Sequence, residues 1–266
     1  MAPNFRAGKG AVLLFNNADL SQILTGVTVE ASVNALDTTV LQNNDKTYIA
    51  GLRDGTVSYE GLYDGTALST ASTASTGALD ARFQSALAAS TQPIVTYGPE
   101  DDSSIGNRVR MFRQEQTAYT ASSPVDDVVK VSAAGQISGR HDSGVWLHPL
   151  AARLTTSSTF ASFDSAVDAG TTGGGVGHLH VTASSTLTSV VVKIQHSTAV
   201  SESTAGWTDL ITFSSFDETT GATAVQRTTA SGTVGRRTRA IISTYTGGAA
   251  KTATLAVAFA RRGENV

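Results

Sequence analysis

The sequence predicts a mostly-β protein with one amphipathic helix. Two observations carry this prediction: stretches with the period of a helix are almost absent, and apolar and polar residues alternate with a period of two in many short segments. With 266 residues, the chain is long enough for one large domain or two ordinary domains. The expected architecture is a β-sandwich or barrel followed by a second β-sandwich.

Two segments in the first quarter of the chain alternate most clearly. In the first, Val27, Val29, Ala31 and Val33 share one face, and in the second Val57, Tyr59 and Tyr63 do so. Successive side chains of a strand point to opposite faces, so these apolar sets are expected to take the core. The residues expected to face away from the core are Thr28, Glu30, Ser32, Thr56, Ser58 and Glu60.

Other segments read as strands by the same criterion, and one reads as a helix. The expected strands are Ala11–Phe15, Pro93–Tyr97, Arg108–Thr120, Val125–Ser132, His178–Ala183, Ser189–His196, Leu210–Ser214, Ala224–Thr228, Arg237–Ser243 and Thr252–Arg261. A helix of about four turns is expected to begin near Thr76, with Leu79, Phe83 and Leu87 on its apolar face. It would close one end of the sandwich.

A domain boundary is expected near residue 155. Residues 155–159 and 170–175 are rich in Ser, Thr and Gly, which is loop composition. Residues 1–155 would form the first domain, and residues 156–266 would form a second β-sandwich. The pattern leaves open whether this sandwich is immunoglobulin-like or a jelly roll.

Composition excludes several classes of protein. The chain has no cysteine, so disulfides and thiolate metal sites are excluded. The only apolar run near the start, Ala11–Phe15, is too short for a signal peptide or a membrane span, so we expect a soluble protein made in the cytoplasm. Residues 1–155 carry 11 Lys and Arg against 15 Asp and Glu, and residues 156–266 carry 8 against 7. Neither part has the basic excess that nucleic-acid binding needs.

No catalytic, cofactor or metal site is expected. Gly173–Gly177 is followed by a strand and not by a helix N-terminus, so it reads as a linker and not as a phosphate loop. His178 and His180 share one face of a strand but have no obvious third ligand, so they read as surface or sandwich-edge residues.

Three residues of the second part, Trp207, Arg237 and Arg239, are candidates for a surface contact. Trp207 reads as a core anchor, with a sugar-stacking platform as the alternative. Arg237 and Arg239 read as solvated or salt-bridged side chains, with contact to a polyanion or glycan as the alternative.

The order of motifs in residues 37–64 resembles the major tail tube proteins of long-tailed, non-contractile bacteriophages. Asp37-Thr38-Thr39 is followed by a polar run, then by Thr47-Tyr48-Ile49-Ala50-Gly51-Leu52, then by an alternating segment that ends at Asp64. Matching segments lie at residues 8–16, 95–99 and 123–129. Trp207-Thr208-Asp209-Leu210, with Phe213, resembles the extra C-terminal domain of tail proteins from phages of actinobacteria.

The resemblance implies a structural virion protein of the phage tail, and no enzyme. It implies stacked rings of six subunits whose inner sheets join around a DNA channel, with the tape measure protein and tail-end proteins as further partners. DNA would pass without being held, and the polar residues that face away from the core would line the lumen. The alternative is a carbohydrate-binding or adhesion module, which in most settings needs a signal peptide or a disulfide.

A loop between Asp37 and Gly51 is longer and more polar than a hairpin of one domain requires. We therefore expect it to contact the next ring of the tube. The residues expected to make this inter-ring contact are Asp37, Thr38, Thr39, Asn43, Asn44, Asp45, Lys46, Thr47 and Tyr48.

Overall fold

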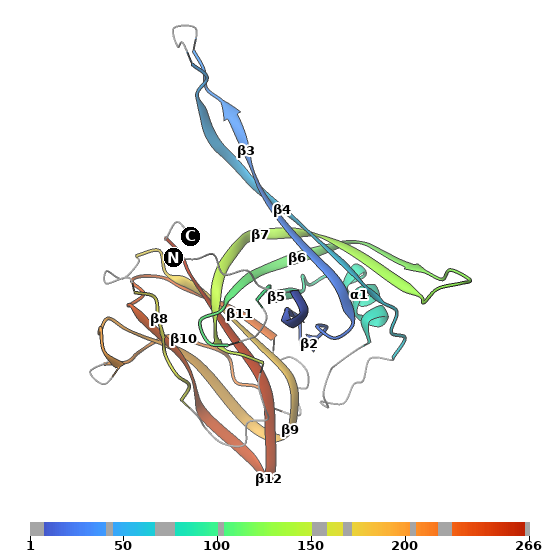
Figure 1. The fold of residues 1–266 in the computed structure, drawn as a ribbon. Coiled ribbons are helices and arrows are strands. Elements are labelled where there is room, and N and C mark those ends of the chain that lie inside the picture. The colour runs from blue at the N-terminus through green and yellow to red at the C-terminus, as the bar shows by residue number, and fades with distance from the viewer. Residues whose placement is uncertain are drawn as a thin grey trace.

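The structure is a computed structural model, and it describes residues 8–40, 45–66, 78–100, 104–150, 159–166, 172–202, 206–217 and 225–263. The protein is mostly β, with 65% strand and 6% helix, as the alternation predicts. The described strands form one 12-stranded sheet in the order β10-β9-β12-β7-β6-β5-β1-β2. From this path β11 branches off β9, β8 off β12, and β4 with its partner β3 off β7 (Figure 1).

The elements of the first part of the chain are η1 (Gly8–Gly10), β1 (Val12–Phe15), β2 (Ala18–Asp19), β3 (Leu24–Asp37), β4 (Tyr48–Leu62), α1 (Leu79–Leu87), β5 (Ile94–Gly98), β6 (Arg108–Ser122) and β7 (Lys130–His148). The prediction for β7 was partly wrong. Val125–Val129 lie in the turn of the β6–β7 hairpin, residues 123–129, and β7 runs from Lys130 to His148. Pairing with β6 and then with β12 extends β7 beyond the segment that alternates in sequence.

The second part contains β8 (Phe163–Asp164), β9 (Gly175–Ser197), β10 (Thr208–Thr212), β11 (Val225–Ala230) and β12 (Arg237–Arg261). Four strands predicted from the sequence merge into two here. The segments 178–183 and 189–196 are both parts of β9, and 237–243 and 252–261 are both parts of β12. The two strands pair antiparallel along nearly their whole length, and register shifts around Gly247 accommodate their curvature.

The parts of β3 and β4 beyond the Glu30–Thr56 pair, residues 31–37 and 48–55, pair only with each other and form an arm that projects from the body of the molecule (Figure 1). Their ladder runs from Leu24 opposite Gly61 to Asp37 opposite Tyr48. The prediction of a loop from Asp37 to Gly51 was therefore wrong at both ends, because Asp37 and Tyr48–Gly51 lie in strands. Cross-strand hydrogen bonds fix these residues where composition alone reads as loop.

The helix is shorter than predicted. Nine residues form α1, after Ala78 with a left-handed φ of 59°, and the predicted start at Thr76 lies outside the described residues. Leu79, Phe83 and Ala86 are buried as expected for one face, but Leu87 is 48% exposed. Each helical residue turns by about 100°, so position i+8 lies about 80° away from position i. The apolar face therefore ends at Ala86.

The first hydrophobic core lies under β3, β4, β7 and β6. Phe83 of α1 stacks on Tyr59 at 5.2 Å between ring centroids and meets Phe15 edge-on at 5.3 Å. Val57 and Tyr59 are buried as predicted, whereas Val33 is 50% exposed because it lies on the arm. Tyr63 lies beyond the end of β4 and is 44% exposed, so its predicted place in the core was wrong.

The two parts of the chain share a core. A second cluster lies between β9, β12 and β10, but a third joins Leu14, Met111 and Trp146 to Val176 and Ala256. β7 also pairs directly with β12, from Val145 opposite Phe259 to His148 opposite Val257. The division of the chain into two domains at residue 155 stays a prediction. If the chain is divided there, residues of the third cluster fall on both sides of the boundary.

Buried polar side chains also link the two parts of the chain where they meet. His178 and His180 of β9 are fully buried, and the Thr96 hydroxyl of β5 lies 2.9 Å from His178 Nδ1 and 2.8 Å from His180 Nε2. The expectation that these histidines lie at the surface was wrong, because β9 lies against β5 and not at an edge. Asp142 of β7, 2% exposed, binds Arg227 at 2.9 Å and Arg262 at 3.2 Å.

Candidate assembly surfaces

The strands β3, β4, β7 and β6 form a four-stranded section of the sheet in this order, and one face of this section is polar and uncovered; we call it the polar face. The register aligns its residues in rows, such as Glu30–Thr56–Gln136–Glu115. All six side chains that the alternation turned away from the core are exposed, on β3 and β4. β6 and β7 add residues that the sequence reasoning did not place here, namely Glu115, Thr120, Ser132 and Gln136.

Buried glutamines explain why β6 was not recognised as part of this face. Gln114 and Gln116 are 0% and 4% exposed and lie on the core side, so β6 shows no clean apolar–polar alternation. The Tyr59 hydroxyl donates to Gln114 Oε1, and the Gln114 amide donates to Gln116 Oε1 at 2.7 Å. This network satisfies the polar groups that burial would otherwise penalise. A Cβ on Gly135 would lie 2.8 Å from Gln114 Nε2, so glycine makes room for the network.

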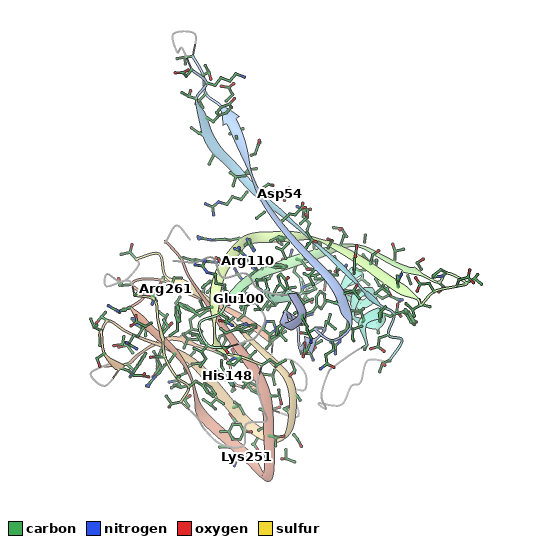
Figure 2. The ribbon with its side chains drawn as sticks, in the orientation of Figure 1. Asp54, Glu100, Arg110, His148, Lys251 and Arg261 are labelled. Atoms are coloured by element: carbon green, nitrogen blue, oxygen red, sulfur yellow. The ribbon has the colours of Figure 1, made fainter. Side chains whose placement is uncertain are left out.

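The polar face carries more acids than bases. Glu30, Asp54, Glu60 and Glu115 lie on it, against Arg113 and Lys130. Asp54 lies on β4 (Figure 2), and its carboxylate accepts a hydrogen bond from the Gln136 amide across the sheet. The surface is therefore hydroxyl-rich and weakly acidic, a combination that repels phosphate groups at low salt.

Both edges of this sheet are open among the described strands. β3 pairs with β4 alone, and β6 has no strand partner on its outer side beyond Gln114, whose N–H donates to the Pro93 carbonyl at 3.2 Å just past the end of the ladder with β5. Open edges present unpaired backbone N–H and C=O groups, which pair readily with another strand. A single sheet that offers two long open edges is suited to edge-to-edge assembly.

The arm carries large apolar side chains that the subunit itself leaves in solvent. Leu36 is 45% exposed and lies directly opposite Ile49, which is 56% exposed. Leu52, in the β-bulge of β4, is 86% exposed, and Val33, Val40 and Tyr48 are each at least 50% exposed. A two-stranded hairpin is marginally stable by itself, and exposed apolar clusters mark contact surfaces. Of these apolar side chains, only that of Tyr48 was among the residues predicted from the sequence to contact the next ring.

Local hydrogen bonds order the arm near its tip. Thr38 N–H donates to the Thr47 carbonyl at 2.9 Å, and Thr47 N–H donates to the Thr39 hydroxyl at 3.0 Å. Hydrogen bonds from the Thr39 side chain and backbone lower the pKa of Asp37. Asp45 and Lys46 lie between these groups and the tip and are exposed, while Asn43 and Asn44 lie outside the described residues.

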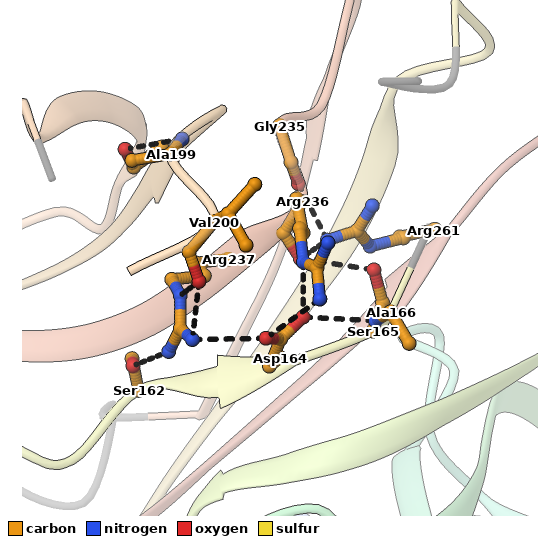
Figure 3. Close-up of polar contacts among 11 residues, drawn as sticks. Ser162, Asp164, Ser165, Ala166, Ala199, Val200, Gly235, Arg236, Arg237 and Arg261 are labelled. Carbon is orange, nitrogen blue, oxygen red and sulfur yellow. Dashed lines mark hydrogen bonds and ion pairs between the residues drawn. The ribbon is translucent and has the colours of Figure 1, made fainter. Parts of the chain in front are cut away.

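The three predicted contact residues of the second part are occupied within the chain. The Arg239 guanidinium lies 4.0 Å from the centroid of the Trp207 ring, so it covers one ring face. Arg237 binds Asp164 at 2.9 Å and donates to the Val200 carbonyl at 2.7 Å, as Figure 3 shows. These arginines tie β12 to neighbouring segments, and a sugar could stack only on the opposite face of Trp207.

No group of three or more His, Asp or Glu side chains within the described ranges is placed to hold a metal ion. The one described α-helix, α1, is too short to cross a membrane.

No protein-family model matches the chain, and no curated protein matches it in sequence. Solved structures of tail particles are among its structural neighbours. The virion of a native gene transfer agent particle contains a chain 14% identical, which aligns over 52% of this chain and 97% of its own length with a TM-score of 0.39. The SPP1 tail tube is 11% identical over 50% and 76%, with a TM-score of 0.40. The SPP1 Dit protein is 13% identical over 93% and 98%, with a TM-score of 0.34. TM-scores of this size do not by themselves establish a common fold.

Proposed function

We propose that the protein is the structural subunit of a phage tail tube, assembled as stacked rings through which DNA passes. One observation carries the proposal: a four-stranded sheet has a packed core on one face, a bare polar surface on the other, and an open edge on each side. A sheet of this kind completes itself by joining copies of itself into a closed cylinder. The resemblance of residues 37–64 to tail tube proteins supports the same proposal.

The topology specifies how neighbouring subunits would join. Every pairing in the order β3-β4-β7-β6 is antiparallel, so β3 and β6 run in opposite directions. In a ring whose subunits are related by rotation, the β3 edge of one subunit meets the β6 edge of the next. That contact is then antiparallel as well, and the sheet continues around the ring without a change of pattern. Six subunits per ring is the number that the resemblance implies.

In such a ring the polar face lines the channel. The core and α1 cover the other face of the sheet, so the uncovered face must be the inner one. Glu30, Glu60 and Glu115 would then face the DNA, and their repulsion of phosphates would keep the DNA from adhering as it passes. The ladder between β12 and β7 covers residues 145–148 of β7, away from the polar face, and this supports a position of residues 156–266 outside the channel wall.

The arm would join successive rings. Its apolar side chains, Leu36 opposite Ile49 above all, require a partner surface that the isolated subunit does not provide. The arm also extends well beyond the body in the direction of β3, as a contact between rings requires (Figure 1). The tape measure protein and tail-end proteins are the further partners that the resemblance implies.

Electron microscopy of the purified protein tests the proposal. The wild-type chain is expected to form tubes of stacked rings. The double variant Leu36→Ser and Ile49→Ser is expected to remain folded but to stop at single rings or subunits, because the arm loses its apolar contact. Val200→Ser is the matched control, since Val200 is 64% exposed but lies far from the arm in sequence and fold. Wild-type protein that stays monomeric at high concentration would overturn the proposal.

A further inference from the structure

The turn of the β6–β7 hairpin, residues 123–129, has the composition of a contact surface. We call it the hairpin tip. Val125 is 100% exposed and Val128 is 55% exposed, and the acidic pair Asp126 and Asp127 lies between them. The hairpin extends from the side of the body (Figure 1), and within its own subunit nothing described covers Val125. An exposed valine next to two carboxylates suits a partner surface with an apolar floor and a basic rim.

A hollow with these properties lies beside the start of β3. Its volume is about 430 Å³, and we call it the β3 hollow. Leu13, Leu24, Val27 and Tyr97 supply its apolar surface, and Lys9 and Thr25 lie among its lining residues. Lys9 and Thr25 are exposed, and Leu24 and Val27 are half-buried, so the subunit itself leaves the hollow accessible.

The register brings these two features to the same level of the sheet. Leu24 of β3 lies opposite Gly61 of β4, Gly61 opposite Val131 of β7, and Val131 opposite Ala121 of β6. One row across the sheet therefore connects the start of β3 with the end of β6. When β6 of one subunit lies antiparallel to β3 of the next, the chain that leaves β6 passes the start of the neighbouring β3. The hairpin tip then emerges at the neighbour's β3 hollow.

We propose that the hairpin tip of each subunit docks into the β3 hollow of the adjacent subunit in the ring. Val125 contacts the apolar floor, and Asp126 approaches Lys9 at the rim, while Asp127 pairs with Lys130 of its own subunit at 2.5 Å. The occupant is thus a second copy of this chain, and the inference rests on the ring closure proposed above. The contact would extend the joint between subunits beyond backbone pairing and fix the register of β6 against the next β3, which backbone pairing alone specifies weakly.

Disulfide trapping tests this contact, because the natural chain contains no cysteine. The double variant Val125→Cys and Thr25→Cys is assembled, confirmed as rings by electron microscopy, oxidised, and run on a denaturing gel without reductant. A disulfide forms only where the Cα atoms approach within about 7 Å. The expected result is a ladder of covalent multimers that ends at the full ring. Each single-cysteine variant should give no ladder, since head-to-tail contacts do not bring identical positions together.

The matched control pairs Val125→Cys with Val200→Cys, another exposed valine, and should give no ladder. Rings without a ladder in the Val125–Thr25 pair would overturn the docking contact while leaving the tube proposal intact. Absence of rings from the wild-type chain would overturn both. If the Val125→Cys substitution itself prevents ring formation, the pair Lys9→Cys and Asp126→Cys retains Val125. The same ladder is then expected, and rings without it would overturn the contact.

Discussion

Acid should destabilise this protein at the junction between the two parts of the chain. Burial holds the pKa of His180 down at about 4, and it places the pKa of His178 well below its ordinary value. Arg227 of β11 and Arg113 of β6 lower the pKa of His178 further by charge repulsion, as does His180 itself. His148, on β7 at the same junction, also has a pKa of about 4 because of burial.

The direction of the pH effect follows from the pKa values of these histidines in the folded and in the unfolded chain. The unfolded histidines have a pKa of about 6.5, so as the pH falls the unfolded chain takes up protons first. Above about pH 6.5 these histidines are neutral in both states and do not lower the free energy of unfolding. As the pH falls from about 6.5 to about 4, the unfolded chain binds the protons and the free energy of unfolding decreases progressively. A histidine with pKa values of about 4 folded and 6.5 unfolded loses about 2 kcal/mol of stability between pH 7.5 and pH 5. His148 and His180 together lose about 4 kcal/mol, a large share of the stability of an ordinary domain.

Urea unfolding of dissociated subunits at pH 7.5, 6 and 5, followed by tryptophan fluorescence, measures this loss. His180→Gln should reduce the loss of stability between pH 7.5 and pH 5 by about 2 kcal/mol, the share of one histidine, because His148 and His178 still take up their protons in the unfolded chain. Val200→Ser keeps all five histidines and should retain the wild-type dependence. Carboxylates whose pKa is lowered, such as Asp164, act mainly below pH 4 and do not overlap this window. Equal stability at pH 7.5 and pH 5 would refute the reasoning.

Three further perturbations test other parts of the structure. Replacing Glu30 and Glu60 with lysine should leave the stability of the subunit nearly unchanged, since both are exposed, but should make assembled tubes retain DNA in a salt-dependent binding assay; tubes with no gain in DNA binding would argue against an inward polar face. Gly135→Ala should lower the stability by about 1–3 kcal/mol in urea unfolding, because the new Cβ meets the buried Gln114 amide; an unchanged midpoint would contradict this. Asp142→Asn should cost about 3 kcal/mol, because it leaves Arg227 and Arg262 beside an uncharged group at a buried site, and a neutral result would show that the charge is dispensable.

Alternation predicted well those parts of the fold in which one face of a strand meets the core and the other meets solvent. Val57 and Tyr59 point inward and Thr56, Ser58 and Glu60 outward, as their period of two requires. Alternation did not identify the buried face of a strand where the buried residues are themselves polar. Gln114 and Gln116 are buried because Tyr59 and each other supply hydrogen-bond partners, and only the tertiary structure reveals that pairing.

Two other failures have a common cause in long-range contacts. His178 and His180 read as surface residues because an imidazole is polar, yet β5 and the Asn16 carbonyl bury and bind them from more than 80 residues away in sequence. The arm read as a loop because residues 38–47 are polar, although the ladder extends from Asp37 opposite Tyr48 towards the body. Its exposed Leu36 and Ile49 were visible in the sequence, but their exposure was not, because exposure depends on how far the arm projects.

A cryo-EM map of the assembled protein tests the central claim most directly. It is predicted to show stacked rings in which β3 of each subunit pairs antiparallel with β6 of its neighbour, so that a continuous barrel presents Glu30, Glu60 and Glu115 to an open channel. A closed assembly in which the polar face lies on the outside, or in which β3 and β6 meet no neighbouring strand, would contradict the account.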